Sequence, residues 1–150
     1  MNTSTKHHYS NCRPRRRLLL MKLNHLDLQV SDVGRSATFF ERYFGLCVRS
    51  NAGSAALVIL TDEAGFVLVL QRAKAEARYP EGFHLGFLLG DVRDVHALHA
   101  RAKADGTPVS DVIVNGRGSM VYLTAPDGYY VEVSCQNHRF APAPSPDSMS

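Results

Sequence analysis

Residues 23–32 have the sequence Leu23-Asn24-His25-Leu26-Asp27-Leu28-Gln29-Val30-Ser31-Asp32. Apolar and polar side chains alternate along this segment, as they do in a β-strand with one buried face. The buried face would carry Leu26, Leu28 and Val30, and the other face His25, Asp27 and Gln29. A single histidine is more often an ordinary polar residue than a metal ligand. The segment alone therefore leaves the role of His25 open.

A helix and three more strands are predicted after this strand. Asp32 is a residue type that caps helix N-termini, aromatic residues provide an apolar stripe as far as Phe44, and Gly45 suits a left-handed C-terminal position. Strand-like patterns bounded by turn residues then follow at residues 46–49, 55–60 and 66–70.

The same order of elements then begins again. A second strand starts at His84 and ends at Asp91, seven residues later, just as Asp32 follows His25 by seven. The pattern predicts a helix over 92–105 and strands at residues 109–114, 119–124 and 129–135. The chain is thus predicted to be an internal duplication of strand–helix–strand–strand–strand, with about 55 residues in each copy.

The duplicated region defines the expected domain organisation. One domain over residues 22–136 is predicted, with module 1 at about 22–76 and module 2 at about 80–136. Residues 1–21 are expected to be a disordered basic extension and residues 137–150 a disordered tail.

Composition excludes several classes of function. The net charge is +3, but residues 1–21 carry five basic residues and no acidic one, so the remainder of the chain carries −2. A folded region of that charge is not expected to bind nucleic acid. No apolar run is long enough for a membrane span. Three cysteines without a CxxC pair favour a reducing, cytoplasmic location over secretion.

The duplication changes the interpretation of the histidines. His25 and His84 occupy the same position in the two copies, and Glu132 stands within an otherwise apolar alternation on the last strand. A carboxylate there would be costly to bury without a partner. Two neutral imidazoles and one carboxylate form a ligand set for one divalent metal, such as Fe, Mn, Zn, Ni or Co. Such a set leaves coordination positions open for water or substrate.

These motifs resemble the vicinal oxygen chelate superfamily, which includes glyoxalase I, fosfomycin-resistance thiol transferases, extradiol dioxygenases and bleomycin-resistance proteins. The resemblance covers about residues 22–136. It rests on the segment around His25, on Phe83-His84-Leu85-Gly86-Phe87, and on Ala125-Pro126-Asp127-Gly128-Tyr129-Tyr130-Val131-Glu132. It implies an α+β fold in which two βαβββ modules form a cupped mixed sheet around a central metal cleft.

The resemblance also implies a site and partners. The metal ligands would be His25, His84 and Glu132, the substrate a small oxygen-bearing molecule, and the assembly a homodimer. In such proteins the two modules of one cleft come either from one chain or from two swapped subunits.

Several positions depart from the patterns of individual families. Where glyoxalase I has a fourth ligand this chain has Val69, with Gln71 on the same strand face as a weaker candidate. The acid–base histidine that extradiol dioxygenases place ahead of the second ligand is missing. Asp27 stands where the fosfomycin enzymes have threonine, and Tyr122 keeps their ten-residue spacing to the ligand glutamate.

Tyr122 and Asp27 are therefore the candidate catalytic residues. Tyr122 is equally compatible with sheet packing, and Asp27 with a solvated charge, although a carboxylate there would be placed to hold a proton or orient a ligand. Arg117 is interpreted either as a clamp for an anionic substrate or as an ordinary exposed arginine.

The predicted function is metal-dependent chemistry on a chelated substrate. Three reaction classes stay open: oxidation by O₂, addition of a thiol to an electrophile, and isomerisation of a hemithioacetal. The alternative is a bleomycin-resistance-type protein that binds a small molecule without catalysis, and a further one is a module with a vestigial site.

Overall fold

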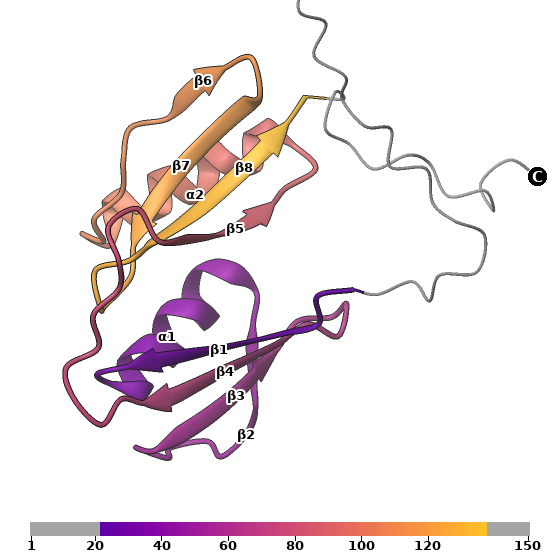
Figure 1. Ribbon diagram of the computed structural model, residues 1–150. Coiled ribbons are helices and arrows are strands. Elements are labelled where there is room, and N and C mark those ends of the chain that lie inside the picture. The colour runs from indigo at the N-terminus through magenta and orange to yellow at the C-terminus, as the bar shows by residue number, and fades with distance from the viewer. Residues whose placement is uncertain (1–21, 138–150) are drawn as a thin grey trace, which may run out of the picture.

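Two four-stranded sheets, each backed by one helix, form the part of the chain that the computed structural model describes, residues 22–137 (Figure 1). Module 1 contains β1 (His25–Val30), α1 (Val33–Phe44), β2 (Cys47–Ser50), β3 (Leu57–Thr61) and β4 (Val67–Arg72). Module 2 contains β5 (His84–Leu88), α2 (Val92–Ala104), β6 (Ile113–Asn115), β7 (Gly118–Thr124) and β8 (Tyr130–Gln136). The predicted α+β fold of two βαβββ modules is confirmed. The tail is predicted to start at residue 137; Asn137 is described and hydrogen-bonds to the Gly116 and Arg117 carbonyls. The predicted disorder of the other residues, 1–21 and 138–150, lies outside the described residues.

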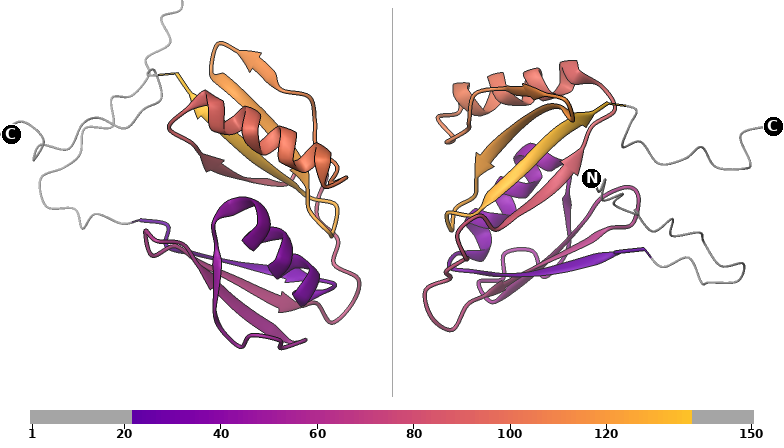
Figure 2. Two further views of the ribbon diagram at one scale, coloured as in Figure 1. Left: turned by 180° about the vertical axis from the view of Figure 1, so that it is seen from behind. Right: turned by 45° about the horizontal axis from the view of Figure 1, so that its top comes forward.

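The two sheets have the same topology. Their strand orders are β1-β4-β3-β2 and β5-β8-β7-β6, and in each sheet the first strand pairs in parallel with the last strand of its module. β1 and β5 are edge strands, and each is the strand of its sheet that lies nearest to the other module (Figure 1). Both helices cover the same side of the molecule (Figure 2). The opposite faces of both sheets therefore carry no helix.

Local sequence explains both helices. The Asp32 carboxylate accepts a hydrogen bond from the backbone N–H of Arg35 at the start of α1, and Asp91 accepts one from Arg93 at the start of α2. Gly45 ends α1 with a φ of 66°, a conformation that glycine adopts without steric penalty. The predicted caps of α1 are thus confirmed. No helix among the described residues is long and apolar enough to cross a membrane.

The strand predicted at residues 109–114 is largely wrong. Only Ile113–Asn115 forms β6, and Val109 makes an isolated bridge to Leu123. In the segment between Val109 and Ile113, the Ser110 hydroxyl accepts a hydrogen bond from the backbone N–H of Tyr122. In a regular sheet, a backbone carbonyl of the neighbouring strand would accept that bond. A serine side chain that replaces the backbone acceptor interrupts the ladder, and alternation in the sequence does not reveal this.

Contacts between the modules fix their relative orientation. Phe44 of α1 stacks on Phe87 of β5 with ring centroids 4.7 Å apart. The Arg42 guanidinium makes a two-pronged contact with the Asp105 carboxylate, at 2.8 and 2.9 Å. The Tyr43 hydroxyl donates to the same carboxylate at 2.8 Å. An apolar contact and a charged network therefore join α1 to module 2.

We expect Asp105→Asn to lower the melting temperature in a pH-dependent way. The hydrogen bonds from Arg42 and Tyr43 hold the pKa of Asp105 below its ordinary value. A carboxyl group whose pKa is lower in the folded than in the unfolded state stabilises the fold at pH values above the ordinary aspartate pKa. This stabilisation is lost as the pH falls through the pKa of the group in the folded state. Thermal unfolding at neutral and acidic pH should therefore show a deficit that shrinks in acid. Asp111→Asn, at an exposed position, serves as the control, and a pH-independent deficit would contradict the prediction.

Candidate metal site

The candidate residues of module 1 lie on the helix-free face of their sheet. In β1, Leu28 and Val30 are buried toward the helix, and His25, Asp27 and Gln29 alternate with them and are exposed. The parallel register pairs His25 with Val67, Asp27 with Val69, and Gln29 with Gln71. The predicted division of β1 into an apolar and a polar face is confirmed.

The register of module 2 gives the symmetry-related positions. His84 pairs with Tyr130, and Gly86, two residues further, pairs with Glu132. In module 1, Asp27 stands two residues after His25, and it pairs with Val69. The structure therefore confirms that Val69 is the counterpart of Glu132, and one of the two modules offers no carboxylate at this place.

Glu132 is an almost buried carboxylate with few partners. The residue is only 8% exposed to solvent. The Tyr122 hydroxyl donates to Oε2 of Glu132 at 2.8 Å across the β7–β8 pair, and this bond raises the pKa of Tyr122 above its ordinary value. Because a carboxylate has about four acceptor positions, Glu132 retains acceptor capacity that a metal ion would use.

Both histidines are held with one particular nitrogen free. Nδ1 of His84 lies 2.9 Å from the backbone oxygen of Gly82. A carbonyl oxygen only accepts, so Nδ1 is the donor of this bond, and in the neutral ring Nε2 would be the nitrogen that can bind a metal. Nδ1 of His25 lies 3.2 Å from the side-chain oxygen of Asn24, which favours the same tautomer. A second partner that fixes the tautomer is typical of metal-binding histidines.

The predicted residues form two groups rather than one. Module 2 brings His84, Tyr122 and Glu132 together, with the rings of His84 and Tyr122 6.2 Å apart. His25 and Asp27 lie on the other sheet. Within residues 22–137 of a single chain, no three side chains of His, Cys, Asp or Glu come close enough to hold a metal.

Asp27 belongs to a small polar group on module 1. Nε2 of Gln29 donates to the Asp27 carboxylate at 2.9 Å and lies 3.4 Å from Oε1 of Gln71. Gln71 therefore contacts Gln29 in this structure. Its predicted role as a weaker ligand candidate remains untested. A cavity of about 320 Å³ opens beside Asp27 and Gln29, bounded by residues 77–79.

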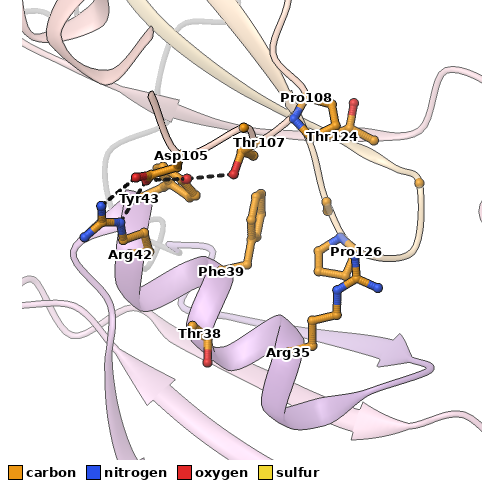
Figure 3. A pocket seen from close by; sticks show the side chains of 13 residues that line it. Arg35, Thr38, Phe39, Arg42, Tyr43, Asp105, Thr107, Pro108, Thr124 and Pro126 are labelled. Atoms are coloured by element: carbon orange, nitrogen blue, oxygen red, sulfur yellow. Dashed lines mark hydrogen bonds and ion pairs between the residues drawn. The ribbon is translucent and has the colours of Figure 1, made fainter. Parts of the chain in front are cut away.

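A larger cavity lies away from these residues, on the helix side. It has a volume of about 690 Å³ and runs between α1 and the segments 105–108 and 124–128 (Figure 3). Phe39 points into its centre, Arg35 closes one end, and the network of Arg42 and Asp105 closes the other (Figure 3). None of the five candidate site residues lines it. The chemistry of the side chains, rather than cavity size, therefore identifies the candidate site.

Residues that sequence reasoning missed are Asn24 and Gly82, which contact the two histidines. Asn24 precedes His25 directly, so the adjacency was a usable signal. Gly82 contributes only a backbone carbonyl, and no pattern of side chains could have indicated it.

The sequence model of the Glyoxalase/Bleomycin resistance protein/Dioxygenase superfamily matches residues 22–133 of this chain. The chain belongs to this superfamily. The family that the motifs suggested, the vicinal oxygen chelate proteins, is thereby confirmed. A search of curated proteins found no match.

Solved structures of this superfamily have the same fold. A possible glyoxalase from Bacillus cereus is 36% identical, with a TM-score of 0.69, and the match covers 77% of this chain and 99% of that one. The fosfomycin resistance protein FosX from Listeria monocytogenes is 18% identical (TM-score 0.67; 81% and 98% covered). Lactoylglutathione lyase from Agrobacterium tumefaciens is 20% identical (TM-score 0.61; 81% and 95% covered). The last two similarities show the fold alone.

Proposed function

We propose that this superfamily member is a divalent-metal-dependent enzyme that acts on a small substrate with two adjacent oxygen atoms. The ligands are His25, His84 and Glu132. The observation that carries the proposal is the state of Glu132, an almost buried carboxylate with spare acceptor positions. Two histidines whose Nδ1 atoms are already occupied support it, because their Nε2 atoms are free to bind a metal. This donor set suits Fe(II), Mn, Zn, Ni or Co.

The proposed site is completed by a second copy of the chain. His25 of one copy joins His84 and Glu132 of the other, since the three do not meet within one chain over residues 22–137. Three exposed apolar side chains share the helix-free face with His84 and Glu132: Leu88, Ile113 and Tyr130. Exposed apolar groups around a polar site favour a protein interface. A homodimer would cover them.

When bound, the metal supplies Lewis-acid chemistry, polarising the chelated oxygens and stabilising negative charge as it develops. Glu132 holds its orientation through the Tyr122 hydroxyl, which makes Tyr122 a positioning residue for the ligand. Asp27 is the proposed proton acceptor, and the Gln29 amide fixes one of its oxygens at 2.9 Å. Val69 in place of a fourth ligand argues against glyoxalase I chemistry, which leaves oxidation and thiol transfer as the favoured classes.

Metal analysis of full-length protein purified without chelator tests the proposal. We expect about one divalent ion per chain, identified by mass spectrometry. His25→Ala, His84→Ala and Glu132→Ala should each reduce the content to less than about a tenth, because each removes one of only three ligands. His96→Ala, at an exposed position on α2, is the matched control and should retain the metal.

The same measurement separates the enzyme from its alternative. Wild-type protein without metal, or ligand variants with unchanged metal content, would overturn the proposed function and favour a small-molecule binding protein. The cytoplasmic location expected from the cysteines remains a separate proposal, tested by fractionation of the source cells.

A further inference from the structure

The cavity on the helix side of the molecule has no part in the proposed metal site. Its volume is about 690 Å³, and small-molecule sites typically have volumes of about 300 to 1,000 Å³. One wall is α1 of module 1, and the other consists of segments 105–108 and 124–128 of module 2 (Figure 3). Because the proposed dimer covers the helix-free faces, it would leave this cavity open.

Arg35 provides a positive charge at one end of this cavity (Figure 3). The other charged residues of the lining, Arg42 and Asp105, pair with each other at 2.8 Å. Within residues 22–137, Arg35 takes part in no ion pair. The lining therefore carries one uncompensated positive charge, which favours an anionic group. A guanidinium binds a carboxylate through two parallel hydrogen bonds.

The middle of the cavity is apolar. The Phe39 ring points into it from α1 (Figure 3), and Pro108, Ala125 and Pro126 line the facing wall. A second aromatic ring would pack against Phe39 in an offset or edge-to-face arrangement, which adds to the gain from burying its apolar surface. The middle of the cavity therefore suits a planar aromatic group.

The far end of the cavity offers a hydrogen-bond acceptor. The Tyr43 hydroxyl donates to the Asp105 carboxylate at 2.8 Å, and its oxygen lies 2.7 Å from Oγ1 of Thr107. Tyr43 has one hydroxyl hydrogen, and Asp105 accepts it, so Thr107 is the donor of the second bond. The Thr107 oxygen then keeps its own acceptor capacity. A hydroxyl group of a ligand would donate to it.

We propose that this cavity is a second small-molecule site, which binds an aromatic carboxylate with a ring hydroxyl opposite the carboxylate-bearing chain. The carboxylate binds Arg35, the ring packs against Phe39, and the hydroxyl donates to Thr107. Arg35 and Arg42 mark the two ends of the cavity and lie seven residues apart on α1, or about 10 Å along its axis. One ring with a short chain spans that length. The site uses none of the proposed metal ligands.

Three matched probes test the assignment. The full probe is para-hydroxyphenylpropionate; phenylpropionate lacks its hydroxyl, and para-ethylphenol lacks its carboxylate. Calorimetric titration into full-length protein should show the full probe binding about tenfold tighter than para-ethylphenol. It should bind about threefold tighter than phenylpropionate, because a neutral hydrogen bond contributes less than one to a charged group. No measurable binding of the full probe would overturn the proposal.

Two variants assign each preference to one residue. Arg35→Gln should remove the preference for the carboxylate and keep that for the hydroxyl, and Thr107→Val should do the reverse. Arg72→Gln is the matched control, because Arg72 is an exposed arginine that lines a different cavity. Unchanged preferences in both variants would overturn the proposal, as would an equal loss in the control.

A carboxylate is also a metal ligand, so Glu132→Ala separates this site from the proposed metal site. The affinity for the full probe should be the same in this variant as in wild type. Nuclear Overhauser effects between the ring protons of the probe and those of Phe39 should place the probe in the helix-side cavity. Loss of binding in Glu132→Ala, or Overhauser effects to the rings of His84 and Tyr122 instead, would place the probe at the metal site and overturn the inference.

Discussion

Mixing two metal-free variants is expected to restore metal binding that neither variant shows alone. In a homodimer of His25→Ala, every site lacks one imidazole, and in a homodimer of Glu132→Ala every site lacks the carboxylate. In a mixed dimer, one site combines both defects and the other receives His25 from one chain and His84 and Glu132 from the other. Random exchange of subunits makes half of the dimers mixed, so about a quarter of wild-type metal content should return.

The measurement is metal content after co-unfolding and refolding of equal amounts of the two variants. The control pair is His84→Ala with Glu132→Ala. Both defects lie on module 2, so every site of the mixed dimer keeps one of them and no metal should return. A site formed within one chain predicts no recovery for either pair, and that result would contradict the shared site.

Gly118→Ala is expected to destabilise the protein by about 3 kcal/mol or more. Gly118 has a φ of 140°, and a Cβ atom there would lie 2.1 Å from the backbone oxygen of Cys135. The atoms that this Cβ atom would meet are backbone atoms of Cys135 and Gln136. Backbone atoms cannot move aside as a flexible side chain can, so β7 and β8 would have to separate at this point.

Thermal or urea unfolding checks this prediction, with an expected fall in melting temperature of about 10 °C or more. Gly116→Ala, two residues earlier, is the control, since a Cβ atom there meets nothing within 4 Å. Equal stability of the two variants would show that the strands accommodate the extra carbon.

Much of the fold follows from local patterns in the sequence. The capping residues Asp32 and Asp91 set the helix starts, and the alternation in β1 correctly separates its two faces. The pairing of Tyr122 with Glu132 follows from their ten-residue spacing, because a hairpin of that length places them opposite each other. The analogy between the two modules likewise pointed to Val69 as the counterpart of Glu132, and the strand registers of the structure agree.

What the sequence could not indicate depends on contacts between distant segments. The contacts between the modules include that of Arg42 with Asp105, which are 63 residues apart. This contact contributes to a packing that leaves His25 away from His84, and alternation within one strand carries no information about it. Arg117 lies 3.9 Å from Glu132, on a turn that Asn137, beyond the end of β8, contacts through two hydrogen bonds.

His25 lies on one sheet, and His84 and Glu132 lie on the other. Metal occupancy of the proposed two-chain site would therefore depend on the concentrations of both the metal and the protein chain. If metal binds only the associated form, each bound ion would tighten the proposed dimer, and dilution would release ions as the chains separate. Metal affinity would then rise with protein concentration instead of being a constant of the chain. In a cell, the amount of this protein would itself regulate how much of it is loaded with metal.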